Sequence, residues 1–100
     1  MPTPIRPERD SALYETILKL RDVDECIRFF EDLCAVTELS AMAQRFDVAR
    51  LLLEGRVYSD ILAETGASSA TVSRVNRMLR SGTGCLGQVL GRGGQEGETP

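Results

Sequence analysis

Residues 65–79 read TGASSATVSRVNRML, and no other part of the chain says as much about its fold. Gly66 follows an apolar run, at a place where a helix would end with a residue in the left-handed region. Ser68 then suits the N-cap of a second helix, because its hydroxyl can accept a hydrogen bond from a backbone N–H two or three residues later. The pattern predicts two short helices, over residues 58–65 and 69–80, joined by a tight turn as in a helix-turn-helix.

The second of these helices has two different faces. Val72, Val75 and Leu79 lie at i, i+3 and i+7, so they share one face, which we expect to be buried. The candidate DNA-binding residues lie at the start of the helix or on and near its other side: Ser68, Ser69, Ala70, Thr71, Ser73, Arg74 and Arg77.

Each of these residue types has a chemical reason to be there. Ser69, Ala70 and Ser73 would face base edges, and Arg74 and Arg77 can bind guanine or phosphate. Ser68 and Thr71 would cap the helix and contact the DNA backbone. A surface hairpin of two helices with solvated arginines would show the same pattern, so that alternative stays open.

The charge distribution favours the DNA-binding interpretation. The chain has 12 Lys+Arg against 15 Asp+Glu, for a net charge of -3, yet no acidic residue occurs between Glu64 and Glu96. Four arginines lie within that interval: Arg74, Arg77, Arg80 and Arg92. A positive stripe on an acidic body can dock on DNA in one orientation, although solvated helix faces could also produce it.

The length and composition predict one small globular domain. The chain has 100 residues, of which 42% are hydrophobic, and no apolar run long enough to span a membrane. Its start lacks the apolar core of a signal peptide, so we expect a cytoplasmic protein. We expect a flexible segment over residues 1–9, the folded domain over 10–90 and a disordered tail over 91–100.

The residues offer little to catalysis or metal binding. There is no histidine, and the three cysteines, Cys26, Cys34 and Cys85, form no disulfide framework. Cys26 and Cys34 would lie about 12 Å apart along one helix, too far to share a metal. We therefore expect no enzyme, no metal and no cofactor.

Three further helices are predicted before the helix-turn-helix. They run from Ser11 to Leu20 with Asp10 as cap, from Asp22 to Cys34, and from Thr37 as N-cap to Glu54, where Gly55 ends the third. After the helix-turn-helix, residues 85–90 are expected to form one or two weak helical turns, because glycines destabilise helices.

The apolar surface is broad for so short a chain. The second helix is apolar over roughly 160° of its circumference by the angular count, and a small chain has limited interior in which to bury such a surface. We expect a second subunit to cover it, in a symmetric dimer whose two helix-turn-helices match a palindrome. A monomer with a large core is the alternative.

Three runs carry a resemblance to a known family: DECIRFFEDLC at 24–34, AQRFDVAR at 43–50 and TGASSATVSRVNR at 65–77. With them the chain resembles the Trp repressor superfamily from about Ser11 to Gly84, and most closely its TrpR-related YerC/YecD family. The resemblance implies an all-α, Trp-repressor-like helical domain with a helix-turn-helix that forms an intertwined homodimer. It also implies that each subunit contacts half of a palindromic operator in double-stranded DNA.

The resemblance marks an effector pocket that departs from the repressor. Two arginines that sandwich the indole of tryptophan in the repressor match Arg45 and Arg74. Val75 stands where the repressor has a glycine, and Met78 where it has a serine that meets the ligand. Methionine offers no comparable hydrogen-bond partner. We expect side chains to fill this pocket, so tryptophan should not be the effector; the identity of any other effector stays open.

Two functions remain in competition. The first is a sequence-specific DNA-binding transcriptional regulator of the Trp-repressor type, independent of tryptophan. The second is a helical protein-interaction or dimerisation module that does not read DNA, which the acidic pI of about 4.9 and the single lysine, Lys19, keep open. A steep dependence of DNA affinity on salt would separate the two, because only a DNA-binding protein releases counterions from phosphates.

Overall fold

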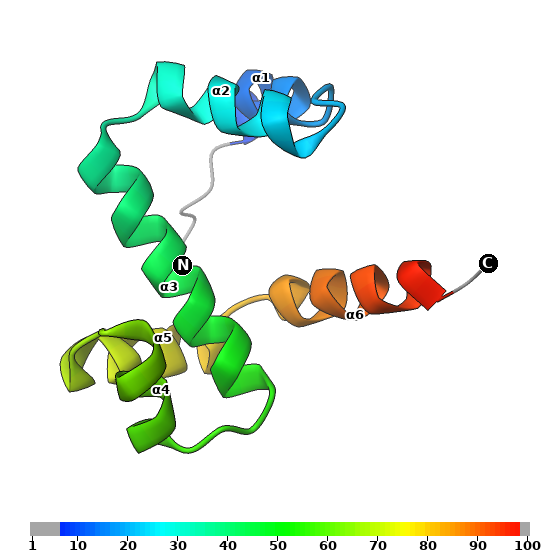
Figure 1. Ribbon diagram of the computed structural model, residues 1–100. Coiled ribbons are helices and arrows are strands. Elements are labelled where there is room, and N and C mark those ends of the chain that lie inside the picture. Colours follow the sequence, from blue (N-terminus) through cyan, green and yellow to red (C-terminus); the bar gives the residue numbers. More distant parts are fainter. Residues whose placement is uncertain (1–6, 99–100) are drawn as a thin grey trace. The chain divides into compact units, whose positions relative to one another are not determined.

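The computed structural model describes the backbone of residues 7–98 and the side chains of residues 11–92. Six α-helices and no strand occur in that range (Figure 1), as the all-α prediction requires. They are α1 Pro7–Ile17, α2 Val23–Leu33, α3 Val36–Leu53, α4 Tyr58–Thr65, α5 Ser69–Ser81 and α6 Cys85–Glu98. Over the same residues, no helix is both long enough and apolar enough to cross a membrane.

The turn between α4 and α5 forms as the sequence predicts. Gly66 adopts a left-handed conformation with φ 73°, and its N–H donates to the Leu62 carbonyl at 3.0 Å. The Ser68 hydroxyl accepts a hydrogen bond from the Thr71 N–H at 3.1 Å, which confirms Ser68 as the N-cap of α5. The turn is therefore built from local hydrogen bonds that its own residue types supply.

Helices α2 and α3 begin with different capping arrangements. The Asp22 carboxylate accepts from the Glu25 N–H at 2.8 Å, so the prediction that α2 starts at this aspartate is confirmed. The prediction of Thr37 as the N-cap of the next helix is wrong, because α3 begins at Val36. At the start of α3 the Glu38 carboxylate points back toward the N-terminus and accepts a hydrogen bond from the Ala35 N–H at 2.7 Å.

Helix α3 ends at a glycine, as predicted, although its last residue is Leu53 rather than Glu54. Gly55 has φ 84°, a conformation that side chains rarely adopt. Its N–H donates to the Leu52 carbonyl at 3.0 Å, and the Arg56 N–H donates to the Leu51 carbonyl at 3.1 Å. These two bonds form a Schellman motif, which turns the chain sharply toward α4.

The first and last helices differ from the predicted ranges. Helix α1 begins at Pro7, before the predicted Asp10 cap, because proline suits the first helical position. It ends at Ile17. The N–H groups of Lys19 and Leu20 then donate to the carbonyls of Thr16 and Ile17, three residues earlier, so the chain after the helix forms a tight turn.

Helix α6 continues past Leu90 to Glu98, which corrects the prediction of a tail without structure from residue 91. Its glycines weaken the helix by up to about 1 kcal/mol each, but no proline interrupts it before Pro100. Residues 1–6 and 99–100 of the predicted terminal segments lie outside the described range.

The chain forms two compact units, Met1–Leu39 and Ser40–Pro100, and the core lies in the second. The buried side chains there come from α3, α4, the turn and α5: Val48, Ala49, Leu51, Ile61, Ala67, Val72 and Val75. Leu52, Leu62, Leu79 and Leu86 pack against this cluster. In the first unit, by contrast, none of the described side chains is buried.

Candidate nucleic-acid interface

The buried face of α5 fixes how this helix lies on the rest of its unit. Val72 is fully buried and Val75 is only 3% exposed, and both belong to the cluster that contains Ile61 of α4. Because Val72 and Val75 are held in the core, the opposite side of α5 must face outward. The predicted division of α5 into a buried and an outward face is therefore confirmed.

The outward face carries the predicted candidate residues. Ser69, Ala70, Arg74 and Arg77 are exposed, and Ser73 is half-buried beside them. Within the described part of the chain, the side chains of Ser69, Ser73, Arg74 and Arg77 form no hydrogen bond with another residue. Their hydroxyl and guanidinium groups are therefore available to an external partner.

Ser68 and Thr71 are used differently. The Ser68 hydroxyl accepts the Thr71 N–H and donates to the Thr71 hydroxyl oxygen, both at 3.1 Å. This pair closes the first turn of α5, so the Ser68 hydroxyl already has both a donor and an acceptor role inside the chain. In these two contacts the Thr71 hydroxyl only accepts, so its hydrogen is not used in the pair with Ser68.

The arginines of α5 have no carboxylate close by, unlike three of the arginines elsewhere in the described part of the chain. Arg28, Arg50 and Arg56 each lie within 4.0 Å of at least one carboxylate. Among the described residues, Arg74, Arg77 and Arg80 have no carboxylate within that distance. The exposed side of α5 therefore keeps its positive charge, although the whole chain is acidic.

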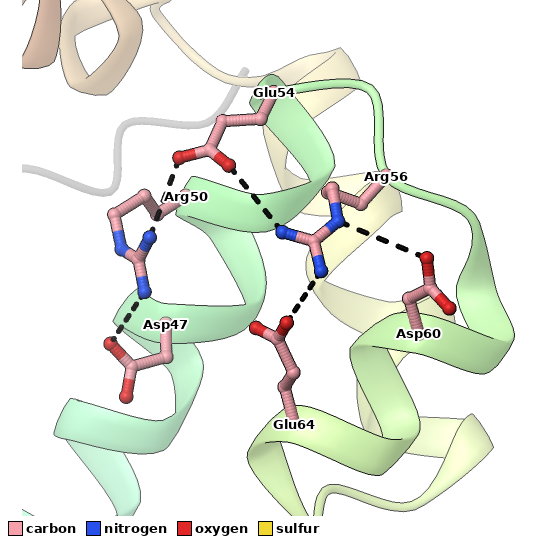
Figure 2. Close-up of polar contacts among 6 residues, drawn as sticks. All are labelled: Asp47, Arg50, Glu54, Arg56, Asp60 and Glu64. Atoms are coloured by element: carbon pink, nitrogen blue, oxygen red, sulfur yellow. Dashed lines mark hydrogen bonds and ion pairs between the residues drawn. The ribbon is translucent and has the colours of Figure 1, made fainter.

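A second polar cluster joins α3 to α4. Figure 2 shows Arg56, in the connection between the two helices, with its guanidinium directed at Glu54, Asp60 and Glu64. Arg56 forms a hydrogen bond with Glu64 and lies 3.9 Å from both Glu54 and Asp60. The hydrogen bond to Glu64, together with its negative charge, raises the pKa of Arg56 above the ordinary arginine value.

Arg56 is not among the residues that the sequence pattern singles out. A signal is present, because carboxylates stand four and eight residues after this arginine and two before it. Charges at such spacings are common on solvated helices, however, and the spacing alone does not show that the chain turns at Gly55 and brings them together.

Three of the four predicted effector-pocket residues border a cavity between α3, α5 and the start of α6. Arg45, Val75 and Met78 line this cavity of about 390 Å³, and Arg74 is not among its lining residues. That side chains exclude tryptophan from this space stays a prediction. Val75, only 3% exposed, and Met78, 50% exposed, both form part of the cavity wall.

The class of protein follows from these features. A short helix, a tight turn and a second helix with one buried and one outward polar face define a helix-turn-helix protein. The outward face is cationic and its side chains are unpaired within the described residues, as a surface that contacts an anionic partner requires.

Comparisons with known proteins identify the family. The model of the Trp repressor protein family matches residues 9–93. The uncharacterised protein YerC of Bacillus subtilis is 47% identical over 88 residues, which are 88% of this chain and 85% of YerC. The chain therefore belongs to the Trp repressor protein family and, within it, to the TrpR-related YerC branch.

Solved structures agree with this assignment. The crystal structure of a TrpR-like protein from Eubacterium eligens matches with a TM-score of 0.83 and 46% identity, covering 87% of this chain and 90% of the other. A candidate Trp repressor from Staphylococcus aureus matches with a TM-score of 0.82 and 40% identity, covering 87% of both chains. The Trp-repressor-like fold and the relation to a family of transcriptional regulators are therefore established for this chain.

Proposed function

We propose that this protein is a sequence-specific DNA-binding transcriptional regulator whose helix α5 enters the major groove. The main support for this proposal is the outward face of α5, where Arg74 and Arg77 are exposed and have no carboxylate partner among the described residues. The N-terminal part of a recognition helix usually contacts base edges. Here that part presents Ser69, Ala70 and Ser73, while Arg74 follows Ser73 directly and Arg77 lies three residues further on.

The active form that we propose is a homodimer. In the first unit, large apolar side chains are exposed on α1, α2 and the residues around them; for example, Leu18 is 85% exposed and Val23 75%. Burying one such side chain stabilises a protein by about 1.5–3 kcal/mol. A second copy of the chain would supply that burial and would place two α5 helices on the two halves of a palindromic site.

We also propose that DNA binding does not require tryptophan. Arg45 borders the cavity but Arg74 does not, so two arginines do not face each other across it. Met78 offers no hydrogen-bond partner for an amino group comparable to a serine hydroxyl. The cavity therefore lacks the pair of arginines, and the hydroxyl at position 78, that the resemblance to the Trp repressor associates with tryptophan.

Selection of bound sequences from a random duplex library tests the proposal. The purified protein is incubated with the library at two salt concentrations, with and without tryptophan. We expect a palindrome to be enriched equally with and without tryptophan, with affinity falling steeply as salt rises. Absence of enrichment at both salt concentrations would refute DNA reading and favour a protein-interaction module.

A further inference from the structure

We propose that Arg56 is a positioning residue that holds the helix-turn-helix against α3 in the orientation that binds DNA, without any ligand. This inference rests on the proposed DNA-binding function. It is supported by the place of Arg56 in the chain, its three carboxylate contacts and the absence of a side-chain hydrogen bond from the N-cap residue of α4.

Arg56 occupies the short connection between α3 and α4, directly after Gly55. Its backbone is already held, since its N–H donates to the Leu51 carbonyl at 3.1 Å. Its side chain is more shielded from solvent than those of its three partners, at 35% exposure against 48–56%. An arginine whose backbone is held in place and whose guanidinium meets several carboxylates loses less side-chain entropy per contact than an isolated surface ion pair does.

The contacts of Arg56 bridge two helices. Glu54 directly follows α3, with its N–H bonded to the Arg50 carbonyl at 3.1 Å. Asp60 lies in the first turn of α4 and Glu64 in its last. Every other ion pair among the described residues stays within one helix and its terminal turn, whereas Arg56 connects α3 to both ends of α4.

Helix α4 depends on such a contact. Val57 stands at its N-cap and provides no side-chain hydrogen bond. The opposite end receives a hydrogen bond from the Gln44 side chain to the Thr65 carbonyl at 3.3 Å, and Ile61 is buried in the core at the middle of the helix. Arg56 adds an ion pair with Asp60 at the start of α4 and a hydrogen bond to Glu64 at its end. Removing Arg56 would therefore weaken the attachment of α4 at both ends and allow it to rotate about Ile61 together with α5.

Two variants with opposite charge changes separate this role from simple electrostatics. Arg56→Ala removes a positive charge and Glu64→Gln removes a negative one, yet both break the hydrogen bond between them. Loss of a negative charge alone would strengthen binding to DNA. We expect both variants to bind the selected operator about three- to fivefold more weakly than the parent, the size that surface ion pairs support.

Matched controls lie in the same polar cluster. Arg50→Ala and Asp47→Asn make similar charge changes, and their contacts stay within α3 and its last turn, as Figure 2 shows. We expect neither control to lose affinity beyond the effect of its charge. The double variant with Arg56→Ala and Glu64→Gln should bind no more weakly than Arg56→Ala alone, because the two side chains share one interaction.

Amide hydrogen exchange reports directly whether α4 is held in place, which the affinity for DNA does not. Exchange of the α4 amides should quicken about three- to fivefold in Arg56→Ala and Glu64→Gln, with exchange in α2 unchanged. The slope of log affinity against log salt should equal that of the parent, because Arg56 is not itself a phosphate contact.

The outcomes are distinct. Tighter binding by Glu64→Gln, unchanged α4 exchange, or equal losses in Arg56→Ala and Arg50→Ala would each overturn the positioning role. If the parent protein itself selects no operator, the proposed function fails instead, and the exchange measurement still decides whether Arg56 fixes α4 on α3.

Discussion

Replacement of Val75 by glycine gives the sharpest test of how the helix-turn-helix is held together. Val75 is 3% exposed and lies in the core cluster with Ile61 and Val72. Loss of its three side-chain carbons removes about 2.4 kcal/mol of burial at roughly 0.8 kcal/mol per group. Glycine within a helix costs about 1 kcal/mol more, and incomplete collapse of the site adds to the loss. We expect Val75→Gly to lower the free energy of unfolding by about 3–4 kcal/mol.

Urea unfolding followed by circular dichroism measures this loss, at one fixed protein concentration because a dimer would make stability concentration-dependent. Arg77→Gly is the matched control, since Arg77 is exposed on the same helix and should lose only the propensity term of about 1 kcal/mol. Equal losses in the two variants would refute the conclusion that Val75 packs in the core. A change in the urea m-value would instead point to an altered unfolded or native ensemble.

Four further variants test α5 and the segment after it. Arg74→Ala combined with Arg77→Ala should abolish operator binding in a mobility-shift assay without changing the oligomeric mass; unchanged affinity would remove both residues from the interface. Ser68→Ala should lower thermal stability by about 1 kcal/mol through loss of the α5 cap, and an unaltered melting temperature would contradict that role. Gly82→Ala should destabilise the protein by about 1 kcal/mol or more, because the added Cβ would lie 2.8 Å from the Met78 carbonyl oxygen. Gly87→Ala meets no atom within 4 Å and should stabilise α6 by up to about 1 kcal/mol; equal effects of the two glycine variants on the melting temperature would show that the close approach at Gly82 is unimportant.

The correctly predicted parts of the fold depend on neighbouring residues. The turn needs Gly66 in a left-handed conformation and Ser68 to cap α5, and both act over four residues or fewer. The apolar spacing of Val72, Val75 and Leu79 likewise acts within one helix. The outward face of α5 follows from the same spacing, so most of the candidate interface can be derived from the order of residues alone.

The incorrect predictions concern places where two local signals compete. Thr37 is a good N-cap by type, but Glu38 reaches back to the Ala35 N–H and starts α3 earlier. The glycines after residue 81 indicate little helix, yet the chain is helical from Cys85 to Glu98. Propensity is a weak guide where the alternatives differ by about 1 kcal/mol per residue.

The helix-turn-helix, its polar face and the family all follow from the order of residues, because caps, turns and periodicity are short-range properties. The exposure of the apolar residues in the first two helices does not, since none of the described side chains before Ser40 is buried and the core lies later in the chain. The cavity beside Val75 and the link from α3 to α4 through Arg56 likewise emerge only when the helices pack. Packing brings together side chains whose spacing along the chain does not predict contact.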